Sequence, residues 1–207
     1  MVSLAAGRAP TTALLPLVVV LIALRAVTAS HLPLSFDEAY FWLWSRHLAI
    51  SYFEHPPLIA LAIRAGTALL GDTSLGVRLM SLLASVAASW AIWRAAAAVF
   101  TDDTSAWTAC AFLNLTLMLT SQSMGATPDI FVLTASAFLL WSVAELERTR
   151  NAWWWLAAAL ALGAALLAKY TAFFLALSLG LWLLLTPQGR RWLTTPWPYL
   201  AAVLAAS

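Results

Sequence analysis

Charged residues are scarce in this chain of 207 residues, in which only 10% are Asp, Glu, Lys or Arg and 63% are hydrophobic. Soluble domains carry roughly 25% charged residues, so the composition excludes an ordinary soluble protein. Cysteine is limited to Cys110, which excludes an internal disulfide. The sequence also lacks a glycine-rich phosphate loop, an HExxH motif, a Cys/His cluster and an internal repeat. Apolar sequence and tryptophan are abundant, and they predict an all-α, polytopic transmembrane protein.

Apolar runs separated by short polar turns predict about six complete membrane spans and a truncated seventh. The run from Ala152 to Leu185 would be about 51 Å long as one helix, so it is predicted to be a hairpin of two spans with Lys169 near its turn. The chain reaches Ser207 inside an apolar run, which indicates a fragment of a longer protein. The predicted spans are 13–29, 75–100, 106–120, the helix after Thr127, two within 152–185, and the run from Pro196.

The N-terminal apolar segment has two readings. It favours a first span with a cytoplasmic N-terminus, and the alternative is a signal peptide cleaved after Ala29. With the first reading, the positive-inside rule places these residues in the cytoplasm: Arg8, Arg94, Arg148, Arg150, Arg190 and Arg191. Five further basic residues then fall outside: Arg25, Arg46, Arg64, Arg78 and Lys169. An anionic ligand on the outer face would explain the outer five.

Residues 31–74 form the predicted first extracytoplasmic loop, which is rich in aromatic and ionisable side chains. Ser35 followed by Glu38 reads as a capping box, so a helix is expected to begin at Phe36 and to end near Ala49. A second short helix is expected from Leu58 to Leu70. Both are too short to cross a bilayer and are predicted to lie at the membrane–water interface.

The string DEAYFWLWSRHLAISYFEHPPL, which begins at Asp37, resembles the first extracytoplasmic loop of the GT-C glycosyltransferases. The resembling branch is bacterial and includes relatives similar to protein O-mannosyltransferases and the lipid A aminoarabinose transferase. There, an acidic pair follows the first span, and an aromatic-Phe-Glu-basic-Pro-Pro element closes the loop. Here these are Asp37-Glu38 and residues 52–57. The resemblance covers about residues 10–190, and it implies a GT-C fold in the bacterial inner membrane with an active site facing the periplasm or exterior.

Asp37 matches the catalytic acid of this family, and its first hypothetical role is that of a general base. The alternative is a first-turn acid that stabilises the helix dipole. Glu38 has a structural role in the capping box and is also a candidate substrate-binding residue. Glu54 matches a glutamate at the family's active centre, which predicts a catalytic, substrate-binding or metal-binding role. His55 stands where several relatives have Lys, so its predicted contact with phosphate is weaker.

Three further positions match the family. Asp129 follows Thr127 and Pro128, so it is either an ordinary helix-start acid or the family's acidic site residue. Arg78 and Lys169 match basic positions that face the lipid phosphate, although either could instead extend toward lipid headgroups. Tyr170 is assigned to the same substrate-binding group.

The sequence therefore predicts an inverting membrane glycosyltransferase that uses a polyprenyl-phosphate-linked sugar and could require a divalent metal ion. The expected partners are that donor, membrane lipids and an acceptor lipid, glycan or protein, with no nucleic acid. Two alternatives are a transporter or flippase for an anionic lipid or solute, and a noncatalytic assembly subunit. A transporter predicts ionisable groups deep within spans or helices broken at matching positions, which the sequence does not show.

Overall fold

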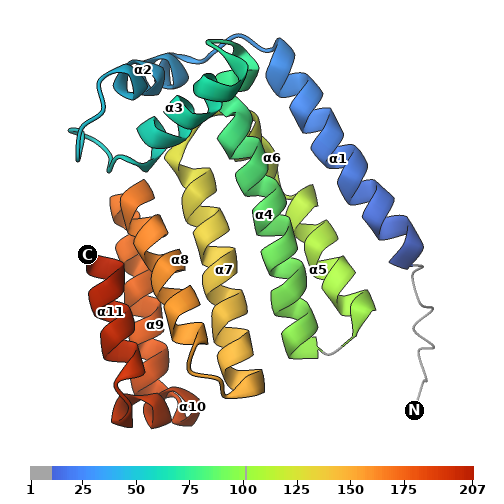
Figure 1. Cartoon of the computed structure of the whole chain (residues 1–207). Coiled ribbons are helices and arrows are strands. Elements are labelled where there is room, and N and C mark those ends of the chain that lie inside the picture. The colour runs from blue at the N-terminus through green and yellow to red at the C-terminus, as the bar shows by residue number, and fades with distance from the viewer. Residues whose placement is uncertain (1–10, 101) are drawn as a thin grey trace.

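The computed structural model describes residues 11–100 and 102–207, and within them it contains helices and no strand. Two short helices, α2 (Phe36–Arg46) and α3 (Leu58–Leu70), lie across one end of a bundle of upright helices (Figure 1). The other elements are α1 (Thr11–His31), α4 (Ser74–Phe100), α5 (Asp103–Leu115), α6 (Leu117–Met124), α7 (Pro128–Thr149), α8 (Trp154–Ala168), η1 (Tyr170–Ala172), α9 (Phe173–Leu185), α10 (Pro187–Arg190), η2 (Arg191–Thr194) and α11 (Trp197–Ala206). This confirms the all-α class, while the prediction for Arg8 lies outside the described residues.

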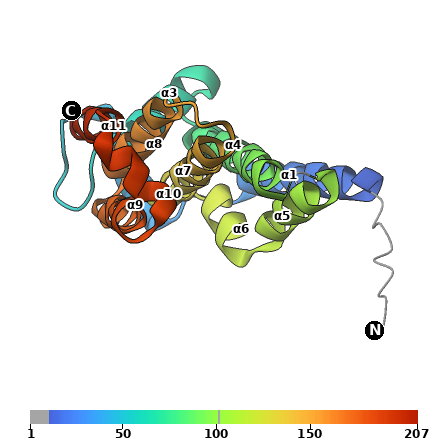
Figure 2. The ribbon, with the colours of Figure 1, turned by 90° about the horizontal axis from the view of Figure 1, so that it is seen from below.

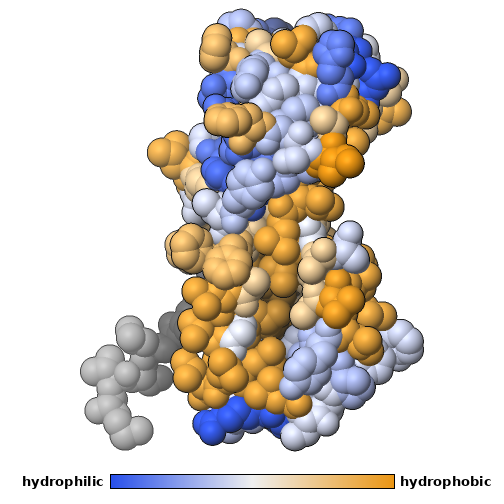
Figure 3. Space-filling model, turned by 90° about the vertical axis from the view of Figure 1, so that its left-hand side faces the viewer, coloured by the Kyte–Doolittle hydropathy of each residue, from blue (hydrophilic) through white to orange (hydrophobic). Residues whose placement is uncertain are grey.

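Three helices of the described chain, α1, α4 and α7, are long and apolar enough to cross a membrane. The η1–α9 segment and the α10–η2 segment, bent by 88° at their junction, would add a fourth if they form one span. Figure 3 shows mainly hydrophobic surface between two ends where hydrophilic residues gather. The chain is thus a polytopic membrane protein, and the number of six complete spans stays a prediction.

The expected span from Ala106 to about Thr120 is interrupted, because the helix breaks at Thr116. Thr116 has an extended backbone, and its side chain caps α6 by accepting a hydrogen bond from the Leu119 N–H at 3.2 Å. The break frees the carbonyl group of Asn114, which accepts a hydrogen bond from the buried Arg25 of α1. The broken helix is therefore held by a side chain of another span.

The run 152–185 folds as the predicted hairpin, with α8 and α9 side by side and the turn at Lys169 (Figures 1 and 2). Helix α7 begins after Thr127 with Pro128 at its first position, also as predicted. It packs along α4, where the Trp90 and Trp141 rings meet edge to face with their centroids 4.7 Å apart. Consequently, α7 and the hairpin bring Asp129 and Lys169 to the same end of the bundle.

The layer formed by α2 and α3 is held together by a core cluster that includes Phe41 and Trp44 of α2 and Ile59 and Ile63 of α3. Helix α2 ends at Arg46, earlier than the predicted end near Ala49. Beyond Arg46, hydrogen bonds of the Tyr52 hydroxyl take the place of those of a further helical turn. This hydroxyl accepts from the Ala49 N–H at 3.1 Å and donates to the Trp44 carbonyl at 3.0 Å.

Candidate functional site

Glu38 fixes the start of α2. Its carboxylate accepts the Ser35 N–H at 2.8 Å, while the Ser35 hydroxyl accepts the Glu38 N–H at 3.3 Å, so the predicted capping box is present. The same carboxylate accepts the Ala126 N–H at 3.0 Å, from the loop before α7. Burial, the largest influence, acts to raise the pKa of Glu38, but its bonds with Arg78, Ser35 and Ala126 outweigh burial and lower the pKa. The carboxylate is therefore ionised and bound within the protein, and its predicted contact with a substrate stays a prediction.

Arg78 is the partner of Glu38, and it is buried as well. Its guanidinium donates to the two carboxylate oxygens of Glu38 at 2.6 and 2.7 Å. It also donates to three backbone carbonyls at the end of α1 and just after it, those of Ala29, Leu32 and Pro33, at 2.7, 2.9 and 2.8 Å. Because arginine has five N–H donors, none remains for a phosphate. In this structure Arg78 connects α1, α2 and α4, and its predicted contact with a lipid phosphate stays a prediction.

Asp37 lies beside this anchored glutamate, in the first turn of α2. Its side chain is exposed, and within the described chain its carboxylate has no hydrogen bond and no ion pair. The backbone on which it sits is fixed from both sides by the bonds of Glu38 to Ser35 and Ala126. The arrangement thus presents a free carboxylate from a rigid position.

Asp129 and Lys169, which the sequence indicated separately, form an ion pair. The Lys169 Nζ lies 2.8 and 2.9 Å from the two carboxylate oxygens of Asp129. Both side chains are partly accessible, with exposed fractions of 27% for Lys169 and 33% for Asp129, so the pair borders solvent. Asp129 is three residues beyond Ala126, whose N–H binds Glu38. The segment 126–129 therefore contacts both places: its Ala126 N–H binds Glu38 at the start of α2, and its Asp129 carboxylate binds the partly exposed ammonium of Lys169.

His55 lies near this pair, in the loop between α2 and α3. Its ring packs edge to face against Phe41 at a centroid distance of 5.7 Å. Burial lowers the pKa of His55, the nearby Lys169 lowers it further, and Glu54 and Asp129 act in the opposite direction. The net lowering keeps His55 mainly neutral near pH 7, so Lys169 carries the positive charge of this region.

Glu54 is exposed and has no ion pair or hydrogen bond with another described residue. No group of three or more His, Cys, Asp and Glu side chains that could hold a metal ion occurs in the described part of the chain. The residues around Glu54 therefore do not form a metal ligand set here, and its metal role stays a prediction.

Tyr170, at the turn of the hairpin, contacts the loop between α2 and α3. Its hydroxyl lies 3.2 Å from the hydroxyl of Ser51. Tyr52, next in the chain, stacks on Trp44 with a centroid distance of 4.4 Å and an interplanar angle of 3°. The sequence did not indicate a role for Ser51 or Tyr52, although Tyr52 is the aromatic residue of the family motif. The loop is thus joined to α2 at one point and to the hairpin at another.

Comparisons with known proteins identify the family of this chain. Residues 54–207 match the model of the family described as dolichyl-phosphate-mannose-protein mannosyltransferase. The chain is 31% identical over 155 residues to the lipid A galacturonosyltransferase RgtD of Rhizobium johnstonii (strain DSM 114642 / LMG 32736 / 3841). The match covers 74% of this chain and 33% of that relative, so the chain spans about a third of the relative's length. No solved structure matches significantly.

Proposed function

This chain belongs to the dolichyl-phosphate-mannose-protein mannosyltransferase family, and from that membership we propose that it acts as a membrane glycosyltransferase. The proposed reaction moves a sugar from a polyprenyl-phosphate donor to a hydroxyl group of an acceptor. The observation that carries the proposal is the free, rigidly placed carboxylate of Asp37, joined through one loop to the Lys169–Asp129 pair.

In the proposed reaction Asp37 is the general base. It takes the proton of the acceptor hydroxyl while that oxygen attacks the anomeric carbon of the sugar. The bond between the anomeric carbon and the phosphate oxygen breaks at the same time, and the electron pair leaves with the lipid phosphate. Attack from the face opposite the phosphate inverts the anomeric configuration. The absence of an ion pair at Asp37 within the described chain leaves its carboxylate available for this step.

Lys169 receives the lipid phosphate in this proposal. Its ammonium is partly accessible and is held by Asp129, which orients it in the absence of a phosphate. A phosphate oxygen can join or replace the contact with Asp129, and a positioned cation stabilises the charge that develops on the leaving group. Neutral His55 can donate a hydrogen bond to the same phosphate, while Glu54 and Tyr170 are proposed to contact the sugar.

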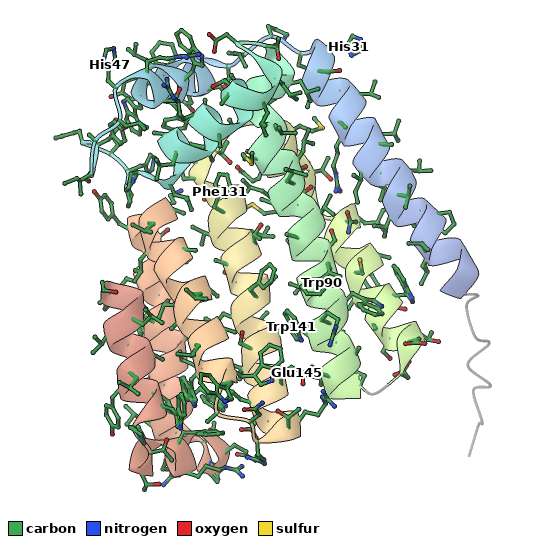
Figure 4. All side chains as sticks on the ribbon, in the orientation of Figure 1. His31, His47, Trp90, Phe131, Trp141 and Glu145 are labelled. Carbon is green, nitrogen blue, oxygen red and sulfur yellow. The ribbon has the colours of Figure 1, made fainter. Side chains whose placement is uncertain are left out.

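The proposed site lies at the outer end of the bundle, where the active site would face the periplasm of a bacterial inner membrane. Figure 4 shows His31 and His47 at this end and Glu145 at the opposite end. Glu145 is buried among arginines, with Arg148 at 2.7 Å and Arg94 at 3.9 Å. These arginines agree with the positive-inside rule and support the proposed orientation. The relative's name suggests a lipid acceptor.

Sugar transfer in isolated membranes tests the function. Membranes that contain the protein are supplied with radiolabelled polyprenyl-phosphate sugars and lipid A as acceptor, and labelled acceptor is separated from donor. The proposal predicts labelled acceptor and free polyprenyl phosphate in equal amounts. Labelled lipid that crosses the bilayer without any transfer would instead support the transporter alternative.

A further inference from the structure

The interfacial helix α3 has one packed face and one open face. Ile59 and Ile63 are buried in the core cluster beneath α2. Leu61 and Arg64, one turn apart, are exposed. An amphipathic helix at the bilayer surface directs such an open face toward lipid. The open face of α3 is therefore available to a membrane molecule.

An apolar groove of about 470 Å³ lies between this helix and the bundle. All of its lining side chains are apolar, and they come from three helices. The main ones are Leu61 and Ala65 of α3, Leu83 and Ala87 of α4, and Phe131 of α7. Phe131 lies at the upper end of α7, just below α3 (Figure 4). The shape and chemistry of the groove suit a hydrocarbon chain.

The position of α3 beside the groove is fixed. At the crossing of α3 and α4, a Cβ atom on Gly66 would lie 2.2 Å from the Gly76 carbonyl oxygen, so the two backbones are in direct contact. Such close approach is possible only without a side chain. The wall of the groove that α3 forms is therefore rigid.

Arg64 adds a cation beside the groove. Three other basic residues at this end are held by acids: Arg46 by Asp72, Arg78 by Glu38, and Lys169 by Asp129. Within the described chain the Arg64 side chain has no acidic partner and no hydrogen bond, and it is exposed. Arg64 precedes the groove-lining Ala65 in the chain, and an unpaired guanidinium at the edge of an apolar groove complements a phosphate group attached to hydrocarbon chains.

The groove also borders the candidate site. Leu58 lines it and follows His55 by three residues, while Phe131 lines it and follows Asp129 by two. The donor phosphate is assigned to Lys169, so a second cation with its own groove indicates a second lipid. We propose that this groove docks the acceptor, a membrane lipid with a phosphate-bearing headgroup and acyl chains, with its phosphate on Arg64 and one chain under α3. The inference rests on the proposed function and names the class of its acceptor.

Photolabelling tests this docking independently of sugar transfer. The protein is placed in phosphatidylcholine vesicles containing phosphatidic acid with a diazirine in its acyl chain, irradiated and mapped by mass spectrometry. Labels are expected on 58–65 and 80–87. Arg64→Gln should reduce them about fivefold, the factor expected for one basic residue at an anionic headgroup. Ala65→Trp fills the groove and should abolish them, whereas Ala68→Trp, on the same helix but outside the groove lining, should not.

Three outcomes would overturn the docking proposal. One is labelling spread over all lipid-facing helices without enrichment in the groove. Another is labelling that Arg64→Gln and Ala65→Trp leave unchanged. The third is competition by undecaprenyl phosphate but not by unlabelled phosphatidic acid, which would assign the groove to the donor. If the labelling pattern is found but no sugar is transferred, only the proposed function and the acceptor role fail, because the lipid site itself is then demonstrated.

Discussion

Glu38 and Arg78 form an ion pair closed to solvent, with the Arg78 Nε 2.6 Å from a carboxylate oxygen and side-chain exposures of 4% and 3%. Arg78 also binds the carbonyl groups at the end of α1, while Glu38 binds the loop before α7. One pair of side chains thus connects α1, α2, α4 and α7. Because Asp37 is the neighbour of Glu38, the position of the proposed base depends on this pair.

Arg78→Met is expected to destabilise the protein strongly. Removal of one partner leaves the other charge buried and uncompensated, which costs about 3–5 kcal/mol. Asp72→Asn is the matched control, because it breaks a partly exposed pair with Arg46 and should cost about 1 kcal/mol or less. Thermal unfolding in detergent compares the two. Equal melting temperatures for both variants would show that the Arg78–Glu38 pair contributes no more to stability than the Arg46–Asp72 pair.

Gly66→Ala is expected to weaken the packing of α3 on α4. Its Cβ would lie 2.2 Å from the Gly76 carbonyl oxygen, so the backbones must separate, and overpacking of this kind costs about 1–3 kcal/mol. Gly180→Ala in α9 is the control, since nothing lies within 4 Å of its added Cβ and alanine favours a helix. Melting temperature should fall for the first variant and stay or rise for the second. A neutral Gly66→Ala would refute the contact between the two backbones.

Lys169→Gln is expected to reduce sugar transfer without unfolding the protein. Hydrogen bonds to charged groups contribute about 1.5–3 kcal/mol, which corresponds to a loss of about tenfold to a hundredfold. Initial rates at several donor concentrations measure the loss. Arg46→Gln is the control, because it also removes a cation at the outer end, but one bound to Asp72 away from the proposed site. Equal rates for Lys169→Gln and the parent would remove Lys169 from the site.

Acidification is expected to destabilise the parent more than His55→Gln. The pKa of His55 is lowered in the folded protein, mainly by burial and then by Lys169, from an unfolded value of about 6.5. As the pH falls below about 6.5, the unfolded state takes up the proton first, so stability decreases until the lowered folded pKa is passed. Above that pH range His55 is neutral in both the folded and the unfolded state, so its titration does not change the stability. Melting temperatures of the two proteins from pH 8 to pH 5 check this, and a constant difference would contradict it.

Local sequence signals predicted the helix starts of the site well. Ser35 and Glu38 form the capping box that their spacing indicated. Thr127 and Pro128 begin α7 as expected, and Lys169 lies at the turn of the hairpin. These features depend on residues within a few positions of one another, and for that reason they can be read from the chain directly.

Features that depend on distant parts of the chain were not predictable in this way. The sequence placed Arg78 near the outer surface, but only the fold shows that the end of α1 and Glu38 occupy all its donors. Asp129 and Lys169 are 40 positions apart, and their pairing follows from the packing of α7 on α8. The break at Thr116 contains neither proline nor glycine, and its stabilisation by Arg25 involves another span.

The base role of Asp37 is tested most directly by comparing Asp37→Asn with Asp103→Asn in the transfer assay. Both acids lie in the first turn of a helix and are exposed, so both substitutions remove a similar favourable interaction with a helix dipole. Only Asp37 is assigned to the chemistry. Loss of transfer by about a hundredfold or more for Asp37→Asn, with normal melting temperature and an unaffected Asp103→Asn, is the predicted result. Equal transfer rates for the two variants and the parent would contradict the account.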